Sequence, residues 1–95
     1  MAKGYWVVRV DVSNADEYAK YAMGNPAIFA KFGGRFLARG GKHAVVEGTG
    51  RARNVLIEFP DFETALACFN SAEYKANMKL RAGHATADIV VVEGT

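Results

Sequence analysis

The order of strand-like and helix-like segments constrains the fold of this 95-residue chain more than any other feature. Four segments alternate apolar and polar residues or are rich in β-branched and aromatic residues, which is typical of strands. Two longer segments repeat apolar residues at helical spacing. The predicted order is strand, helix, strand, strand, helix and strand, over residues 4–12, 13–34, 35–48, 54–59, 61–81 and 87–94. No linker or low-complexity tract divides the chain, so we expect one domain over residues 1–95.

This order matches the split βαβ arrangement of ferredoxin-like domains. It predicts an α+β fold, a β-α-β-β-α-β sandwich whose four-stranded antiparallel sheet carries the helices on one face and leaves the other face bare. We expect Ser13 to cap the first helix and residues 24–26 to interrupt it, with Asn25 capping a second segment. The second helix is expected to be split, with Asp61 and Ser71 capping its two parts.

Alternation within the strands predicts which side chains face the helices. In the first strand Trp6, Val8 and Val10 form a uniformly apolar side, so we assign them to the core. The other side of this strand carries Tyr5, Val7 and Arg9. In the second and third strands, the residues expected on the same bare face are Arg35, Leu37 and Arg39, and Asn54, Leu56 and Glu58.

The predicted bare face is half aliphatic and half charged. Left in water, its apolar part would form a patch of the kind that usually marks an interface. We therefore expect a homodimer in which two sheets close face to face into a dimeric α/β barrel that keeps a polar cleft. Arg9, Arg39 and Glu58 are expected to line this cleft, paired with one another or with a ligand.

The glycine pair at residues 40 and 41 is expected to bend the second strand. Residues 42–48 would then leave as an extension that reaches the partner subunit, with strand character continuing through Val45, Val46 and Glu47. Such an extension would also protect the edge of the sheet from uncontrolled pairing.

Several stretches match a known family in order and spacing: "AKGYWVVRVDV", "FLARGG", "VVEGTGRARNVLIEFPDFETALACFNSAEYKANMKLR" and "VVVEG". Over essentially its whole length the chain resembles the bacterial domain of unknown function 1330 family. That family is similar to dimeric ferredoxin-like α/β barrels, whose members include cofactor-independent antibiotic-biosynthesis monooxygenases, muconolactone isomerases, and haem-binding or haem-degrading proteins. The resemblance implies the fold and the dimer, and it implies no particular activity because such folds host unrelated chemistries.

Arg39 is the first candidate for a functional residue, because its planar guanidinium can hold a carboxylate, carbonyl or enolate of a small metabolite. The alternative is a structural ion pair with Glu58 or Glu47. Glu58 lies among apolar residues, so desolvation would suit it as a general base, whereas an ion pair with an arginine would not.

Three further residues complete the predicted site. His43 begins the extension and is the second candidate for moving a proton. Tyr5 and Arg9 join Arg39 as predicted ligand-binding residues, with Tyr5 as an apolar wall. Neither His43 nor His84 has a cysteine, histidine or carboxylate at metal-ligand spacing, so no metal and no cofactor is expected.

Composition argues against several other classes of protein. The net charge of +2 is not gathered on one face, so a nucleic-acid partner is not expected. The single cysteine, Cys68, excludes an intrachain disulfide and is expected to be a small buried residue of a protein in a reducing compartment. No segment has the apolar length of a signal sequence or of a membrane span, so we expect a soluble cytoplasmic protein with no membrane partner.

Three functional hypotheses follow from these features. The leading one is a homodimer that binds a small organic acid or aromatic metabolite in its cleft, with cofactor-free conversion of that ligand left open. The first alternative is an assembly or interaction module without chemistry, in which the charges only lock the dimer. The second is a haem-binding protein with His43 or His84 as the axial ligand.

Overall fold

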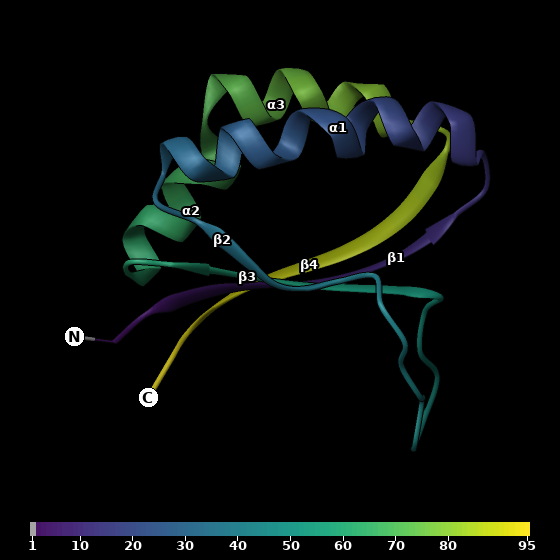
Figure 1. Ribbon diagram of the computed structural model, residues 1–95, viewed down its shortest axis with the longest axis horizontal. Helices are drawn as coiled ribbons and strands as arrows, with labels where there is room; N and C mark the ends of the chain where they lie inside the picture. Colours follow the sequence, from purple (N-terminus) through teal and green to yellow (C-terminus); the bar gives the residue numbers. More distant parts are fainter. Residues whose placement is uncertain (1) are drawn as a thin grey trace.

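The computed structural model describes residues 2–95, which form one antiparallel sheet with all helices on one side (Figure 1). The strands pair in the order β2-β3-β1-β4. The elements are β1 (Gly4–Val12), α1 (Ala15–Lys31), β2 (Arg35–Arg39), β3 (Arg53–Phe59), α2 (Phe62–Asn70), α3 (Ala72–Met78), a 3-10 turn (Lys79–Arg81) and β4 (Ala85–Glu93). This is the predicted α+β ferredoxin-like arrangement, including the split second helix. No helix in the described part of the chain is long and apolar enough to cross a membrane.

The core lies between the sheet and the helices and is centred on Trp6. The indole ring is fully buried, donates from Nε1 to the carbonyl oxygen of Ala65 at 2.8 Å and meets Phe29 and Tyr74 edge to face. Val8 and Val10, the next residues on that side of β1, are also buried, as alternation predicts. Cys68 is fully buried as well, and burial raises the pKa of its thiol to about 12, so it is the inert apolar residue that was expected.

The structure confirms two of the four predicted helix caps. Asp61 accepts from the Thr64 N–H at 2.7 Å and Ser71 accepts from the Tyr74 N–H at 3.2 Å, which confirms both caps. The first helix is capped by Asn14 rather than by Ser13. All three residues are short and polar, which is the property that a cap needs.

The predicted interruption of the first helix at residues 24–26 is wrong, because α1 continues through Pro26. A proline inside a helix removes one N–H and weakens the helix locally. Asn77 of α3 fastens this part of α1, since its Nδ2 donates to the Tyr21 carbonyl oxygen and to Oδ1 of Asn25, both at 2.9 Å. Asn25 therefore does not cap a second segment; it is buried within α1.

Strand β2 contains a β-bulge that changes which way its last residues face. Phe36 pairs with Ile57, but Ala38 pairs with Leu56, so Leu37 is an extra residue in the ladder. Beyond the bulge the alternation is inverted, and Arg39 pairs with the buried residue Val55 of β3. The prediction that Arg39 lies on the helix-free face is therefore wrong: it lies on the helix side.

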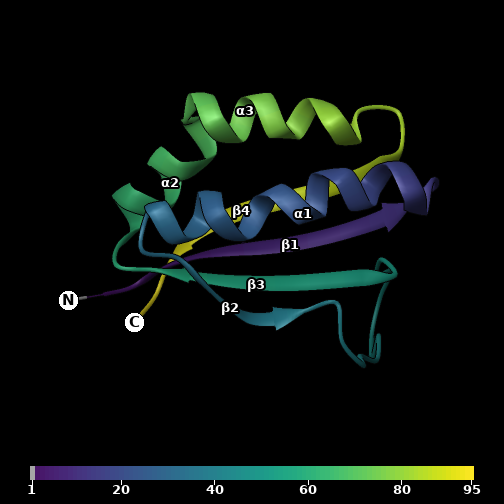
Figure 2. The ribbon, with the colours of Figure 1, turned by 45° about the horizontal axis from the view of Figure 1, so that its top comes forward.

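The segment between β2 and β3 forms an arm, residues 40–52, that projects away from the helices (Figures 1 and 2). The Gly40 N–H donates to the Asn54 carbonyl oxygen at 2.9 Å and closes the neck of the arm. The arm contains no strand, so the predicted strand character of Val45, Val46 and Glu47 is not confirmed. Val46 is 93% exposed, which leaves an apolar side chain in water.

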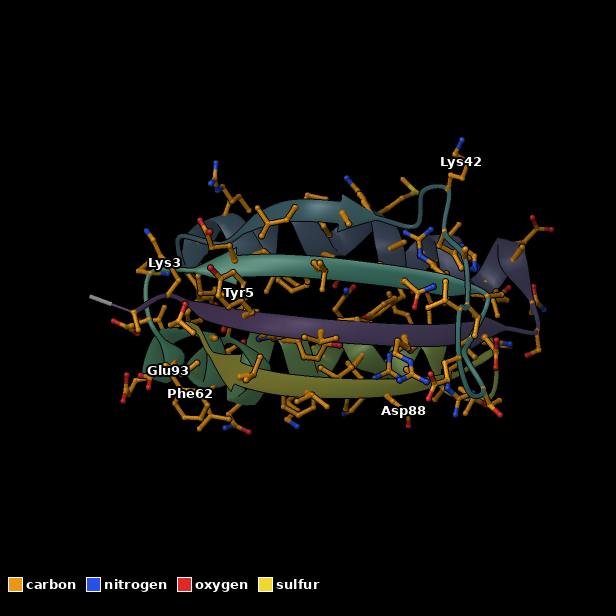
Figure 3. All side chains as sticks on the ribbon, turned by 90° about the horizontal axis from the view of Figure 1, so that it is seen from below. Lys3, Tyr5, Lys42, Phe62, Asp88 and Glu93 are labelled. Carbon is orange, nitrogen blue, oxygen red and sulfur yellow. The ribbon has the colours of Figure 1, made fainter. Side chains whose placement is uncertain are left out.

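The helix-free side of the sheet, here called the open face, consists of three cross-strand rows (Figure 3). The middle row is apolar and charged or polar rows lie on either side of it. The rows are Arg35–Glu58–Tyr5–Val92, then Ala38–Leu56–Val7–Val90, then Asn54–Arg9–Asp88. Val90 is 57% exposed and Leu56 is 39% exposed, so the apolar row is open to water within one chain.

Candidate functional site

A cleft lies on the helix side of the sheet, between α1 and strands β1, β2 and β3. Its walls are mostly apolar and aromatic, and five of its side chains carry polar groups. The apolar lining is Trp6, Val8, Ala22, Phe29, Phe36, Val55 and Ile57, and the polar lining is Tyr18, Tyr21, Asn25, Arg39 and Arg53. An apolar cavity with a few convergent polar groups is the usual form of a small-molecule site.

Arg39 reaches the cleft from the last position of β2, because the bulge at Leu37 turns it toward the helices. Its guanidinium lies over the ring of Phe36, with 4.4 Å between the central carbon and the ring centroid. The residue is otherwise exposed, so its side chain can rotate outward at little cost.

Arg53 reaches the cleft from the first position of β3. Its Nε is buried and has no hydrogen-bond partner among the described residues. Its guanidinium packs beside the ring of Tyr18 on one side and against Gly40 on another, where a Cβ would overlap Nη1. A buried donor without a partner is unfavourable by about 1–3 kcal/mol, so an acceptor that reached this Nε would be stabilising.

No acidic side chain among residues 2–95 lines the cleft, and neither cleft arginine forms an ion pair with a described carboxylate. Burial raises the pKa of the Tyr18 phenol, so it remains protonated at neutral pH and can donate a hydrogen bond. The cleft therefore offers two guanidinium groups and a phenol to a ligand, which suits a group that carries negative charge.

The cleft encloses about 20 Å³ of free space, which is room for about one water molecule. A larger ligand needs a wider cleft than this, and Arg39 is the exposed side chain of the lining.

The structure does not bring the other predicted site residues to this cleft. Glu58 lies on the open face and forms an ion pair with Arg35, with 3.0 Å between Oε1 and Nε. The expected pairing of Glu58 with an arginine is therefore confirmed, with Arg35 rather than Arg39 as its partner. Tyr5 and Arg9 also lie on the open face, where Arg9 donates from Nη2 to the Thr49 carbonyl oxygen at 3.2 Å.

His43 lies in the arm and is exposed. Neither His43 nor His84 lines the cleft, and the described residues contain no group of three or more potential metal-ligating side chains. The roles of Glu58 and His43 in moving a proton remain predictions, and the geometry places both of them away from Arg39.

Arg53 is the cleft residue that sequence reasoning missed. The predicted third strand began at residue 54, which left Arg53 in a turn, whereas the ladder includes Arg53 opposite Val10. The signal that could have found it is the alternation itself, because Arg53 lies two residues before Val55 and therefore on the same side of the strand.

Replacing Gly40 by alanine is expected to lower the free energy of unfolding by about 1–2 kcal/mol, because Gly40 has a φ of +68° and its Cβ would displace Arg53. Gly41→Ala is the matched control, since nothing lies near a Cβ there and its φ is not in the left-handed region. Urea unfolding of the two variants measures the difference. Equal effects would show that Gly40 and Arg53 are not packed as described.

The sequence matches the family model described as "Domain of unknown function (DUF1330)" over residues 3–95. No curated protein matches the chain. Among solved structures, the RPA0582 protein of unknown function from Rhodopseudomonas palustris is similar, with a TM-score of 0.77, 15% identity, and coverage of 99% of this chain and 83% of that chain.

Two further solved structures have the same fold. SnoaB, a cofactor-independent oxygenase from Streptomyces nogalater, has a TM-score of 0.64 and 12% identity, with 97% of this chain and 92% of that chain covered. A dimeric ferredoxin-like protein of unknown function from Thermobifida fusca has a TM-score of 0.62 and 11% identity, with 97% and 89% covered. At these identities the similarity establishes the fold alone. Any inference about chemistry therefore has to come from the residues of the cleft.

Proposed function

Because the chain belongs to the family described as a domain of unknown function (DUF1330), its membership supplies no activity, and we propose from the cleft itself that the protein binds a small organic anion. The ligand has a carboxylate or enolate and an apolar, preferably aromatic, body. The observation that carries the proposal is the pair of arginines, Arg39 and Arg53, in a mostly apolar cleft whose lining includes no acidic side chain from residues 2–95.

The two arginines have different tasks in this proposal. Arg53 is fixed inside the cleft and supplies a desolvated donor, where a charge-assisted hydrogen bond is strong. Arg39 is exposed at the entrance and closes over the ligand after it has entered. The aromatic and aliphatic walls exclude water and contact the apolar body, and Tyr18 adds a neutral donor.

A titration with benzoate tests the proposal, with neutral benzamide as the matched ligand of the same shape. We expect calorimetry to show saturable binding of benzoate and at least tenfold weaker binding of benzamide. In Arg39→Met the affinity for benzoate is expected to fall about tenfold, since an exposed charge-assisted contact contributes about 1.5 kcal/mol. Equal affinity of the wild-type protein for benzoate and benzamide would contradict an anion site.

The proposal includes a homodimer in which a second copy covers the open face. Its support is the apolar row of that face, the exposed Val46 of the arm, and the T. fusca protein of the same fold, which is described as dimeric. In an assembly module without a ligand, Arg39 would only lock two copies together. Arg39 lies on the helix side of the sheet, away from the open face, which favours the ligand-binding role over that alternative.

A further inference from the structure

The two cleft arginines are joined by the arm. Arg39 immediately precedes the arm and Arg53 immediately follows it. The neck is closed by the hydrogen bond from the Gly40 N–H to the Asn54 carbonyl oxygen, and the Arg53 guanidinium packs against Gly40. The position of the arm therefore determines where both guanidinium groups can lie.

The returning limb of the arm is fastened to the opposite side of the sheet by Arg51. Its Nη1 donates to Oδ2 of Asp11 and its Nε donates to Oδ2 of Asp88, both at 2.8 Å. The Ala52 N–H donates to Oδ1 of Asp11 at 3.0 Å. Figure 3 shows the limb crossing the end of the sheet at which Asp88 is labelled. These four residues are called the Arg51 clamp below.

One short piece of backbone connects the clamp, which lies on the open face, to the cleft. Arg51 and Arg53 are two residues apart, with Ala52 held between them by Asp11, and Arg51 faces the open side while Arg53 faces the cleft. The Ala52 N–H and the Arg51 guanidinium lower the pKa of Asp11, so the clamp is charged at neutral pH. The clamp therefore holds Ala52, the residue that directly precedes Arg53.

In a single chain the clamp is a surface ion pair, because the side chains of Asp11 and Asp88 are 52% and 60% exposed. Surface ion pairs are weak, since water competes with them and two long side chains must be held in place. A second copy on the open face would exclude water from the clamp and order the arm.

On this geometry, and resting on the proposed function, we propose that the Arg51 clamp positions Arg53 and so couples the two faces of the sheet. Packing of a second copy on the open face strengthens anion binding in the cleft. By thermodynamic reciprocity, an anion in the cleft strengthens the dimer by the same factor. Arg51, Asp11 and Asp88 are positioning residues, because none of them lines the cleft.

Arg51→Met tests the coupling, with benzoate as the probe and protein concentrations at which the dimer is saturated. We expect about fivefold weaker benzoate binding in this variant, although residue 51 does not line the cleft. Arg35→Met is the matched control: it removes an open-face ion pair at the other end of β1, next to Tyr5, and leaves the arm intact. Its affinity for benzoate is expected to equal that of the wild-type protein.

A second readout separates positioning from a simple loss of structure. In sedimentation velocity, saturating benzoate fills both clefts of the dimer and is expected to lower the wild-type dimer dissociation constant about 25-fold, about fivefold for each cleft, and to leave that of Arg51→Met unchanged. If the wild-type protein binds benzoate and Arg51→Met binds it equally well, the coupling is overturned and the anion site stands. If the wild-type protein binds no benzoate, both proposals fall.

Discussion

Replacing Leu56 by glutamate is expected to convert the proposed dimer into a monomer. Leu56 lies in the apolar row of the open face, between Ala38 and Val7, and it is 39% exposed in the single chain. A dimer with twofold symmetry would bury two such carboxylates without partners, and the charges would repel. We expect the dimer dissociation constant to rise more than 100-fold, since the penalty is several kcal/mol.

Sedimentation velocity over a concentration series measures this change, with circular dichroism to confirm the fold. Because residue 56 is solvent-accessible in one chain, the glutamate leaves the monomer folded. Met23→Glu is the control, because Met23 is 80% exposed on α1 and a charge there should leave the dimer unchanged. If the Leu56→Glu protein sediments as a dimer like the wild-type protein, the open face is not the interface.

Replacing Arg53 by methionine is expected to weaken benzoate binding about 30- to 100-fold. The variant loses a charge-assisted contact inside an apolar cleft, which contributes about 2–3 kcal/mol. The fold should be retained, because methionine fills similar space and removes a buried Nε that has no partner in the described chain.

Arg81→Met is the matched control for this experiment. Its Nε is also buried without a partner among residues 2–95, and its guanidinium lies near the ring of Tyr21, yet Arg81 does not line the cleft. Calorimetry should therefore show a large loss of benzoate affinity for Arg53→Met and a small one for Arg81→Met. Similar losses in both variants would mean that the effect is one of general positive charge rather than of the cleft.

The sequence predicted those parts of the fold that depend on local pattern. The apolar alternation of Trp6, Val8 and Val10 requires a covered face, and Asp61 and Ser71 precede their helices in the way that caps do. The order of the segments leaves the split βαβ arrangement as the simplest way to cover one side of the sheet. These features need no knowledge of distant contacts.

The errors lie where one residue or one distant contact decides the outcome. Leu37 is apolar and fits either side of a strand, so nothing in its neighbourhood reveals the bulge that turns Arg39 toward the helices. The hydrogen bonds that fasten α1 just before Pro26 come from Asn77, which lies more than 50 residues later in the chain. Because the bulge at Leu37 was not foreseen, the predicted site combined Arg39 with Arg9 and Glu58, which lie on the other side of the sheet.

The most direct test of the anion site observes the Arg53 side chain itself. In a nitrogen-15 NMR titration, the Nε–H signal of Arg53, assigned by its absence in Arg53→Met, is followed as benzoate is added. The account predicts a saturable downfield shift of that proton, because its buried donor acquires an acceptor, and no such shift with benzamide. An Arg53 signal that stays in place while benzoate binds elsewhere would contradict the account.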